Sequence, residues 1–334
     1  MSEVVIAGAV RTALGRFQGG LSSFKATDLG AMVVDEAVKR AGVDPSAVTE
    51  VIMGNVIGAG LGQNPARQAA LGAKLDFAVS AMTVNKVCGS GLKAVVLGTQ
   101  ALKLGDEEIV VAGGMESMSN APYILRKART GYRLGDGKIV DTMIYDGLWD
   151  AYNDIHMGNT GEITSERYNV PREEMDEYAF NSHRKAAEAA ANGLFKEEIM
   201  PVEIPQRKGD AIVVDTDEGV RADASAESMG KLKPVFKKDG VITAGNASQL
   251  SDGAAALVLM TDTKAAELGV KPMAKVTGYA TGGLEPELVM MAPTIAVPKL
   301  LAKTGLKLAD FDLIELTEAF AVQPCAVMAN LGMD

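Results

Sequence analysis

Cysteine and histidine are scarce in this chain, which contains two of each among its 334 residues. Cys88, His156, His183 and Cys325 lie too far apart in the sequence to form the ligand spacing of a zinc site, so the sequence predicts no bound metal. The same scarcity excludes a small secreted domain held together by several disulfides. We expect both cysteines to be reduced thiols.

Long hydrophobic runs and an excess of positive charge are also missing. No stretch reaches the roughly 18 unbroken apolar residues that a membrane-spanning helix needs, and the first residues lack the basic-then-apolar layout of a secretion signal. The chain has 33 Lys and Arg against 43 Asp and Glu, a formal net charge of −10, which argues against a nucleic-acid partner held through its phosphates. We therefore expect a soluble, cytoplasmic protein.

What the sequence does contain is an alternation of strand-like and helix-like segments. Residues 3–11 read as a buried strand, residues 27–42 as an amphipathic helix that ends at a glycine, and residues 48–56 as a second strand. Residues 80–114 repeat the cycle of strand, helix and strand. This pattern is typical of an α/β fold with a buried sheet.

The composition and the pattern of apolar residues change between residues 121 and 245. Charged loops, short strands and one long helix at 172–192 are separated there by Pro and Gly. After this segment the chain returns to small residues and buried-strand patterns. The change predicts a domain inserted into the α/β part.

An internal repeat relates residues 37–56 to residues 300–320, with Gly42 superposed on Gly305. Both segments read as a helix, a turn and a strand, so the sequence predicts two copies of one unit. At the same offset, a counterpart of Cys88 would fall beyond residue 334. We therefore expect an incomplete second copy, with either another chain or the rest of a longer polypeptide covering its exposed apolar surface.

Cys88 stands where a buried strand is expected to give way to a helix. The unpaired N–H groups at the start of that helix favour an anion such as a thiolate, and Gly89 and Gly91 allow a sharp turn and a close approach of a ligand. The alternative is a small core residue, as a lone buried cysteine usually is. The glycine-flanked turn favours a nucleophile at Cys88, whereas Cys325, on an apolar helix, is expected in the core.

Six motifs resemble those of the thiolase family and follow one another in the family's order: GNVIGAGLGQNPARQAA, NKVCGSGLKAV, VVAGGMESMSNAPY, DAYNDIHMGNTGE, TAGNASQLSDGAAA and ELTEAFAVQ. The chain is similar over its whole length to thiolases of the biosynthetic acetyl-CoA acetyltransferase type. This resemblance implies the α/β thiolase fold, two repeated halves layered α-β-α-β-α. It assigns residues 1–120 and 246–270 to the first half, 121–245 to an inserted loop domain, and 271–334 to part of the second half.

The resemblance also implies an activity, the condensation of two acetyl-CoA molecules to acetoacetyl-CoA and CoA, or the reverse thiolysis. Cys88 would be the acylated nucleophile, with its backbone N–H in an oxyanion hole. Thr317 and Glu318 would complete the catalytic residues, although the family asparagine is replaced by Thr317 in TEAF. No cofactor is implied, since the coenzyme A thioesters are substrates.

The resemblance further implies a set of residues that bind CoA or border the acyl pocket. Ser248 would hydrogen-bond the pantetheine arm, and Arg221 would lie near the nucleotide. From spacing alone, Arg221 is equally well explained as a solvated loop residue and Ser248 as a turn residue. A lone histidine such as His156 is more often structural, and His183 is expected to be structural. The full set is Leu148, His156, Met157, Arg221, Ser228, Phe236, Ala244, Ser248 and Phe320.

Two thiolase motifs do not occur in the sequence: GHP, whose histidine activates the nucleophile, and CxGGG, which carries a second catalytic cysteine. Both belong to the C-terminal segment of the family. We therefore expect the chain to lack that segment, and to work as a homo-oligomer or as a hetero-oligomer with a chain that carries it. Residues 126–138 would form an oligomerisation arm.

Two other functions remain open at this point. A non-catalytic CoA-binding or scaffold subunit of a thiolase complex would keep the turn at Cys88 only as architecture. A condensing enzyme of the fatty-acid or polyketide type shares the fold but pairs its cysteine with two histidines, and the motifs around Cys88 and Ser248 fit it less well.

Overall fold

A computed structural model of the chain describes residues 2–333, which divide into two compact units. Unit 1 comprises Met1–Gly147, Leu194–Gly219 and Leu250–Val276, and unit 2 comprises Leu148–Gly193, Val220–Gln249 and Thr277–Asp334. The domain boundaries expected from the sequence and from the thiolase resemblance are not tested by this division into two units, and they stay a prediction. Within residues 2–333, no helix combines the length and the apolar character needed to cross a membrane.

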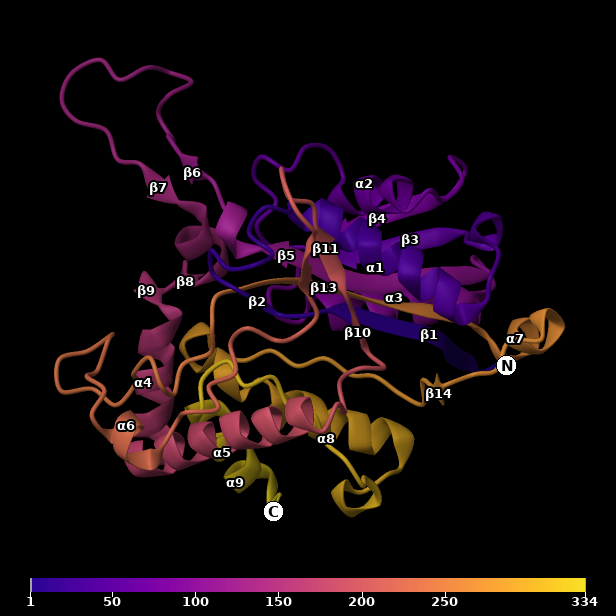
Figure 1. Cartoon of the computed structure of the whole chain (residues 1–334). Coiled ribbons are helices and arrows are strands. Elements are labelled where there is room, and N and C mark those ends of the chain that lie inside the picture. The colour runs from indigo at the N-terminus through magenta and orange to yellow at the C-terminus, as the bar shows by residue number, and fades with distance from the viewer. Residues whose placement is uncertain (1, 334) are drawn as a thin grey trace. The chain divides into compact units, whose positions relative to one another are not determined.

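Unit 1 is built on a mixed β-sheet (Figure 1). Strand β13 (Ser251–Thr261) runs antiparallel to β1 (Val4–Thr12) and β5 (Ile109–Ser117). Strand β3 (Glu50–Gly54) runs parallel to β4 (Ser80–Val84) and β5. Two short strands pair with strands inside this sheet, β14 (Ala274–Lys275) with β1 and β2 (Gly15–Arg16) with β13. The strand order is β10 (Ile199–Met200), β1, β13, β5, β3 and β4.

Helices cover both faces of this sheet. α1 (Ala26–Ala41) and α2 (Pro65–Gly72) pack on one face, and α3 (Ser90–Leu104) packs on the other. The apolar residues of α1 recur every three or four positions, so one side of the helix is buried against the sheet. These elements confirm the strand and helix segments predicted for residues 3–114.

The remaining elements of unit 1 are short. Two hairpins are formed, one by β6 (Tyr123–Ile124) and β7 (Val140–Asp141) and one by β11 (Val202–Ile204) and β12 (Ile212–Val214). A π-helical turn spans Met143–Gly147, and α7 (Asp262–Leu268) follows β13.

Unit 2 is mainly helical. The hairpin of β8 (Trp149–Asp150) and β9 (Ile155–His156) leads into α4, and the core gathers side chains from several helices. Cys325 is a core residue there, as expected, and burial together with the Glu174 carboxylate raises the pKa of its thiol to about 12. The helices are α4 (Met157–Tyr168), α5 (Arg172–Ala191), α6 (Ala226–Gly230), α8 (Pro293–Thr304) and α9 (Val322–Leu331).

The predicted internal repeat is formed only in part. α1 ends at Gly42 with φ 67° and α8 ends at Gly305 with φ 75°, and each is followed by a single 3₁₀ turn, Pro45–Ala47 and Leu308–Asp310. The strand expected at 313–317, the counterpart of β3, is not formed, so that prediction is wrong. A strand is stabilised by its neighbours, and within residues 2–333 no strand pairs with this segment.

Close packing between β1 and α1 gives a test of this fold. A Cβ atom at Gly8 would lie 2.6 Å from the carbonyl oxygen of Ala37, whereas a Cβ at Gly230 meets no atom within 4 Å. We expect Gly8→Ala to lower the free energy of unfolding by about 1–3 kcal/mol because backbone must move. Gly230→Ala should change it by less than about 0.5 kcal/mol. Equal urea midpoints for the two variants would contradict this packing.

Candidate active site

Cys88 lies exposed between the end of β4 at Val84 and the start of α3 at Ser90, which confirms the predicted strand-to-helix junction. The expectation that this strand is buried is wrong, because in the described part of the chain β4 is the last strand of the sheet and has no buried residue. The hydroxyl of Ser90 holds this turn together, because it accepts a hydrogen bond from the N–H of Lys86 at 2.8 Å and donates one to the C=O of Val87 at 2.5 Å. The turn therefore presents the thiol to solvent on a fixed backbone. Sequence reasoning noted the glycines here but missed Ser90.

The first turn of α3 lies directly on the backbone of two paired strands, at Gly54 of β3 and Gly114 of β5. A Cβ atom at Gly54, the last residue of β3, would lie 2.6 Å from the Cβ of Ser90 and 2.7 Å from the backbone N of Gly91. A Cβ at Gly114 on β5 would lie 3.4 Å from the Cα of Gly91. A side chain at position 54 would therefore displace the turn that carries Cys88.

A half-buried carboxylate fixes the loop that follows β3. Glu116 accepts hydrogen bonds from the backbone N–H of Val56 at 2.8 Å and from Nδ2 of Asn55 at 3.0 Å. Burial raises the pKa of Glu116, although these hydrogen bonds act in the opposite direction. The N–H of Asn55 in turn donates to the C=O of Val84 at 3.1 Å, so the carboxylate also steadies the end of β4.

Three residues predicted to line the substrate site gather in unit 2. The rings of His156 and Phe236 are stacked with centroids 4.7 Å apart, and Phe320 meets Phe236 edge-on at 6.2 Å. Gly158 makes room for this stack, since a Cβ there would lie 2.2 Å from the Phe236 ring. The His156–Phe236–Phe320 group is called the aromatic cluster below.

His156 is held as a neutral imidazole. Burial lowers its pKa, and its Nδ1 accepts a hydrogen bond from the N–H of Gly158 at 3.0 Å. This hydrogen bond assigns the ring proton of the neutral form to Nε2. The side chain therefore has one N–H to donate.

Other predicted residues flank the aromatic cluster through the backbone. The N–H of Met157 donates to the C=O of Leu148 at 2.8 Å, and that of Ser248 donates to the C=O of Ala319 at 3.2 Å. A β-bridge joins Ala247 to Phe320. Ala244 and Ser248 are both exposed on the loop at 243–248.

Arg221 and Ser228 have other partners. Ser228 belongs to the capping box of α6, in which its hydroxyl accepts from the N–H of Ser225 at 3.0 Å and its own N–H donates to the hydroxyl of Ser225 at 3.1 Å. The N–H of Arg221 donates to Nδ1 of His183 at 3.2 Å. Within residues 2–333, no hydrogen bond or ring contact joins either residue to the aromatic cluster. Their roles in CoA binding stay a prediction.

The carboxylate of Glu318 is fully engaged by α5. One oxygen accepts from the hydroxyl of Tyr178 at 2.9 Å and the other from that of Ser182 at 2.7 Å. Burial and the neighbouring Glu318 raise the pKa of Tyr178, which keeps this hydroxyl protonated. Thr317 beside it is exposed. Catalytic roles for Thr317 and Glu318 stay a prediction, as does that of Cys88, which belongs to unit 1.

No metal site accompanies these residues in the part of the chain that the structure describes. There, no group of three or more His, Cys, Asp and Glu side chains could hold an ion.

Backbone strain beside Cys88 gives a second test. Val87 has φ 49°, a left-handed conformation that costs a β-branched residue about 1–3 kcal/mol, and its side chain is half exposed. Asn tolerates this conformation, so Val87→Asn should raise the free energy of unfolding by about 1 kcal/mol in urea titrations. The matched variant Val213→Asn, at a half-exposed position of β12, should not gain stability. If Val87→Asn lowered the free energy of unfolding as much as Val213→Asn, the backbone at Val87 would not be strained.

The histidines give a third test, the dependence of stability on pH. Burial lowers the pKa of both His156 and His183 in the folded chain. As the pH falls, unfolded histidines take up protons near pH 6.5, at a higher pH than the folded ones do. The two neutral histidines therefore contribute to the free energy of unfolding in full above about pH 6.5, and this contribution is lost as the pH falls further. His156→Asn keeps an acceptor for the N–H of Gly158, and its unfolding free energy should fall less steeply between about pH 6.5 and 5.5 than that of the wild type. Parallel slopes would show that His156 is not held neutral.

Several proteins named as acetyl-CoA acetyltransferases or acyltransferases are similar to this chain over its whole length. The acetyl-CoA acetyltransferase of Pseudomonas aeruginosa is 52% identical over 334 residues, which are 100% of this chain and 85% of the relative. The probable acetyl-CoA acyltransferase of Staphylococcus aureus (strain COL) is 49% identical, with the same two shares covered. The crystal structure of the Bacillus anthracis acetyl-CoA acetyltransferase matches with a TM-score of 0.97 at 43% identity, covering 100% of this chain and 84% of that one.

Two family models match, the thiolase N-terminal domain at residues 4–263 and the thiolase C-terminal domain at residues 270–334. A thiolase C-terminal domain is therefore present in this chain. The expectation that the chain lacks this segment is not supported, and neither is the expectation that a second polypeptide supplies it. The structural match confirms the predicted α/β thiolase fold. The chain belongs to the thiolase family.

Proposed function

We propose that the chain is an acetyl-CoA C-acetyltransferase that joins two acetyl-CoA molecules to acetoacetyl-CoA and CoA, or runs the reverse thiolysis. The strongest support is that relatives about 50% identical over the whole chain are named acetyl-CoA acetyltransferase. The exposed thiol of Cys88, at the start of a helix, agrees with it.

In the first half-reaction, the Cys88 thiolate attacks the carbonyl carbon of acetyl-CoA. The carbon–sulfur bond to CoA breaks, and CoA leaves as a thiol after taking up a proton. One thioester replaces another, so the acetyl-cysteine intermediate stays reactive enough for the next transfer. Backbone N–H groups at the start of α3 would stabilise the negative charge that develops on the carbonyl oxygen.

In the second half-reaction, another acetyl-CoA gives up a proton from its methyl carbon to the solvent, which balances the proton that the leaving CoA thiolate took up, and that carbon attacks the acetyl group on Cys88. The new carbon–carbon bond forms as the Cys88 thiolate leaves. Thr317 is proposed to contribute to the oxyanion hole of this step. The Nε2–H of His156 is proposed to donate to an acyl-CoA oxygen in the acyl pocket, which the aromatic cluster, Leu148 and Met157 would border.

The CoA thioester itself is proposed to be held by exposed residues of unit 2, with Ala244 and Ser248 along the pantetheine arm and Arg221 and Ser228 nearer the nucleotide. We propose no cofactor besides these substrates. The chain is proposed to act in the cytoplasm as a homo-oligomer, with residues 126–138 as an arm between subunits. In that arm Leu134 is fully exposed. No observation favours a non-catalytic scaffold.

The acetyl-cysteine step can be tested directly. Incubation of the purified chain with acetyl-CoA should add the mass of one acetyl group, located on Cys88 by peptide mass spectrometry. Cys88→Ser should abolish the adduct, because a serine hydroxyl is a far weaker nucleophile without an activating base. Cys325→Ala should retain it, since Cys325 is buried and its raised pKa keeps it a thiol. No adduct at saturating acetyl-CoA, or an adduct on another residue, would refute the proposal.

A further inference from the structure

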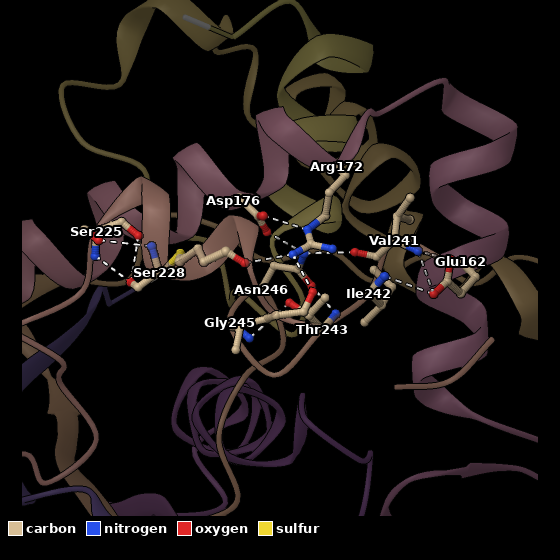
Figure 2. A network of polar contacts seen from close by, with 12 residues as sticks. Glu162, Arg172, Asp176, Ser225, Ser228, Val241, Ile242, Thr243, Gly245 and Asn246 are labelled. Atoms are coloured by element: carbon tan, nitrogen blue, oxygen red, sulfur yellow. Dashed lines mark hydrogen bonds and ion pairs between the residues drawn. The ribbon is translucent and has the colours of Figure 1, made fainter. Parts of the chain in front are cut away.

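Two buried polar side chains join α5 to the loop at 243–248. Asp176 and Asn246 are only 7% and 2% exposed, and Nδ2 of Asn246 donates to Oδ1 of Asp176 at 2.9 Å. The same Nδ2 donates to the C=O of Val241 at 3.0 Å, and Oδ1 of Asn246 accepts from the N–H of Thr243 at 2.8 Å (Figure 2). One amide group therefore closes the loop on itself and ties it to the helix.

Arg172 extends the connection to the end of α6. Its Nε pairs with Oδ2 of Asp176 at 2.6 Å, so both oxygens of this carboxylate are satisfied. Its Nη2 donates to the C=O of Met229 at 2.9 Å and to that of Leu232 at 3.2 Å. The carboxylate of Asp176 is thus the point where α5, α6 and the loop at 243–248 meet.

The backbone of the loop continues this connection to the segment that carries Phe320. The C=O of Asn246 accepts from the N–H of Ala321 at 2.8 Å, and the N–H of Ser248 donates to the C=O of Ala319. The positions of Ala244, Ser248 and Phe320 therefore all depend on where Asn246 is held.

We infer that Asp176 and Asn246 are positioning residues for CoA binding. Neither is proposed to touch the substrate, and the inference rests on the proposed function, in which Ala244 and Ser248 contact the pantetheine arm. Breaking the Asp176–Asn246 hydrogen bond would leave buried polar groups without partners, and the loop would have to move to hydrate them. The contacts to CoA would then be lost while the fold of both units persists.

Isosteric exchanges test this inference. Asn246→Asp removes both N–H donors and sets a second carboxylate against Asp176, so the dissociation constant for CoA, measured by titration calorimetry, should rise about tenfold or more. In the double variant Asp176→Asn with Asn246→Asp, an amide on α5 again faces a carboxylate on the loop. Binding should then recover by at least about threefold. Glu188→Gln, which removes an exposed ion pair from the same helix, should leave binding unchanged.

A second readout separates positioning from a general loss of structure. The rate at which iodoacetamide alkylates Cys88, which belongs to unit 1, should be the same in all variants, and far-ultraviolet circular dichroism should be unchanged. If Asn246→Asp does not fold, Asp176→Asn alone should weaken CoA binding by about threefold, because its one oxygen can still accept from Asn246 while its NH2 group faces the Nε–H donor of Arg172. Unchanged CoA binding, or alkylation that changes in parallel with binding, would overturn the inference. A wild-type chain that binds no CoA would instead overturn the proposed function.

Discussion

The position of Cys88 depends on how closely α3 approaches the backbone of β3 and β5 at Gly54 and Gly114. Gly54 leaves no room for a Cβ atom against Ser90, and the backbone of α3 therefore meets the sheet directly. Because the helix cannot retreat from the sheet without opening a void, the chain must turn sharply between Val84 and Ser90. The left-handed conformation of Val87 is the result, and the hydroxyl of Ser90 stabilises it from within the turn.

Unit 2 fixes its loops by different means, since its core is helical. One side of α5 carries Tyr178 and Ser182, four residues apart, which both donate to Glu318. Arg172 and Asp176, also four residues apart on the same helix, hold the end of α6 and the loop at 243–248. Polar networks whose members are all satisfied give a loop one conformation, which apolar packing alone does less well. A single helix thus organises most of the residues proposed to bind CoA.

The parts of this structure that could be predicted from the sequence are those set by local patterns. The strands and helices of residues 3–114 follow from the periodicity of apolar side chains, and the turn at Cys88 follows from a cysteine that precedes Gly89 and Gly91 at a change of period. The resemblance to thiolases contributed the aromatic residues His156, Phe236 and Phe320, which spacing alone did not select.

What could not be predicted depends on pairing between distant residues. Nothing in the pattern around Asn246 indicates that its amide meets Asp176, 70 residues away, or that Glu318 accepts from Ser182, 136 residues away. His183 looked merely structural, and only the fold places its Nδ1 against the backbone of Arg221. Such contacts leave no periodic signal, because a single polar side chain on a helix gives the same sequence pattern whether it is solvated or buried against a partner from a distant segment.

The internal repeat shows the difference between structure set by nearby residues and structure set by distant pairing. Its helix and glycine cap form in both copies, at Gly42 and at Gly305, because a helix and its cap are stabilised by groups a few residues away. Its strand forms only in the first copy, where β3 lies between β4 and β5. In the second copy, Leu313 and Ile314 keep the apolar character of a buried strand but are 78% and 44% exposed. An apolar strand sequence is therefore not enough to form a strand. The segment also needs neighbouring strands with which its backbone can pair.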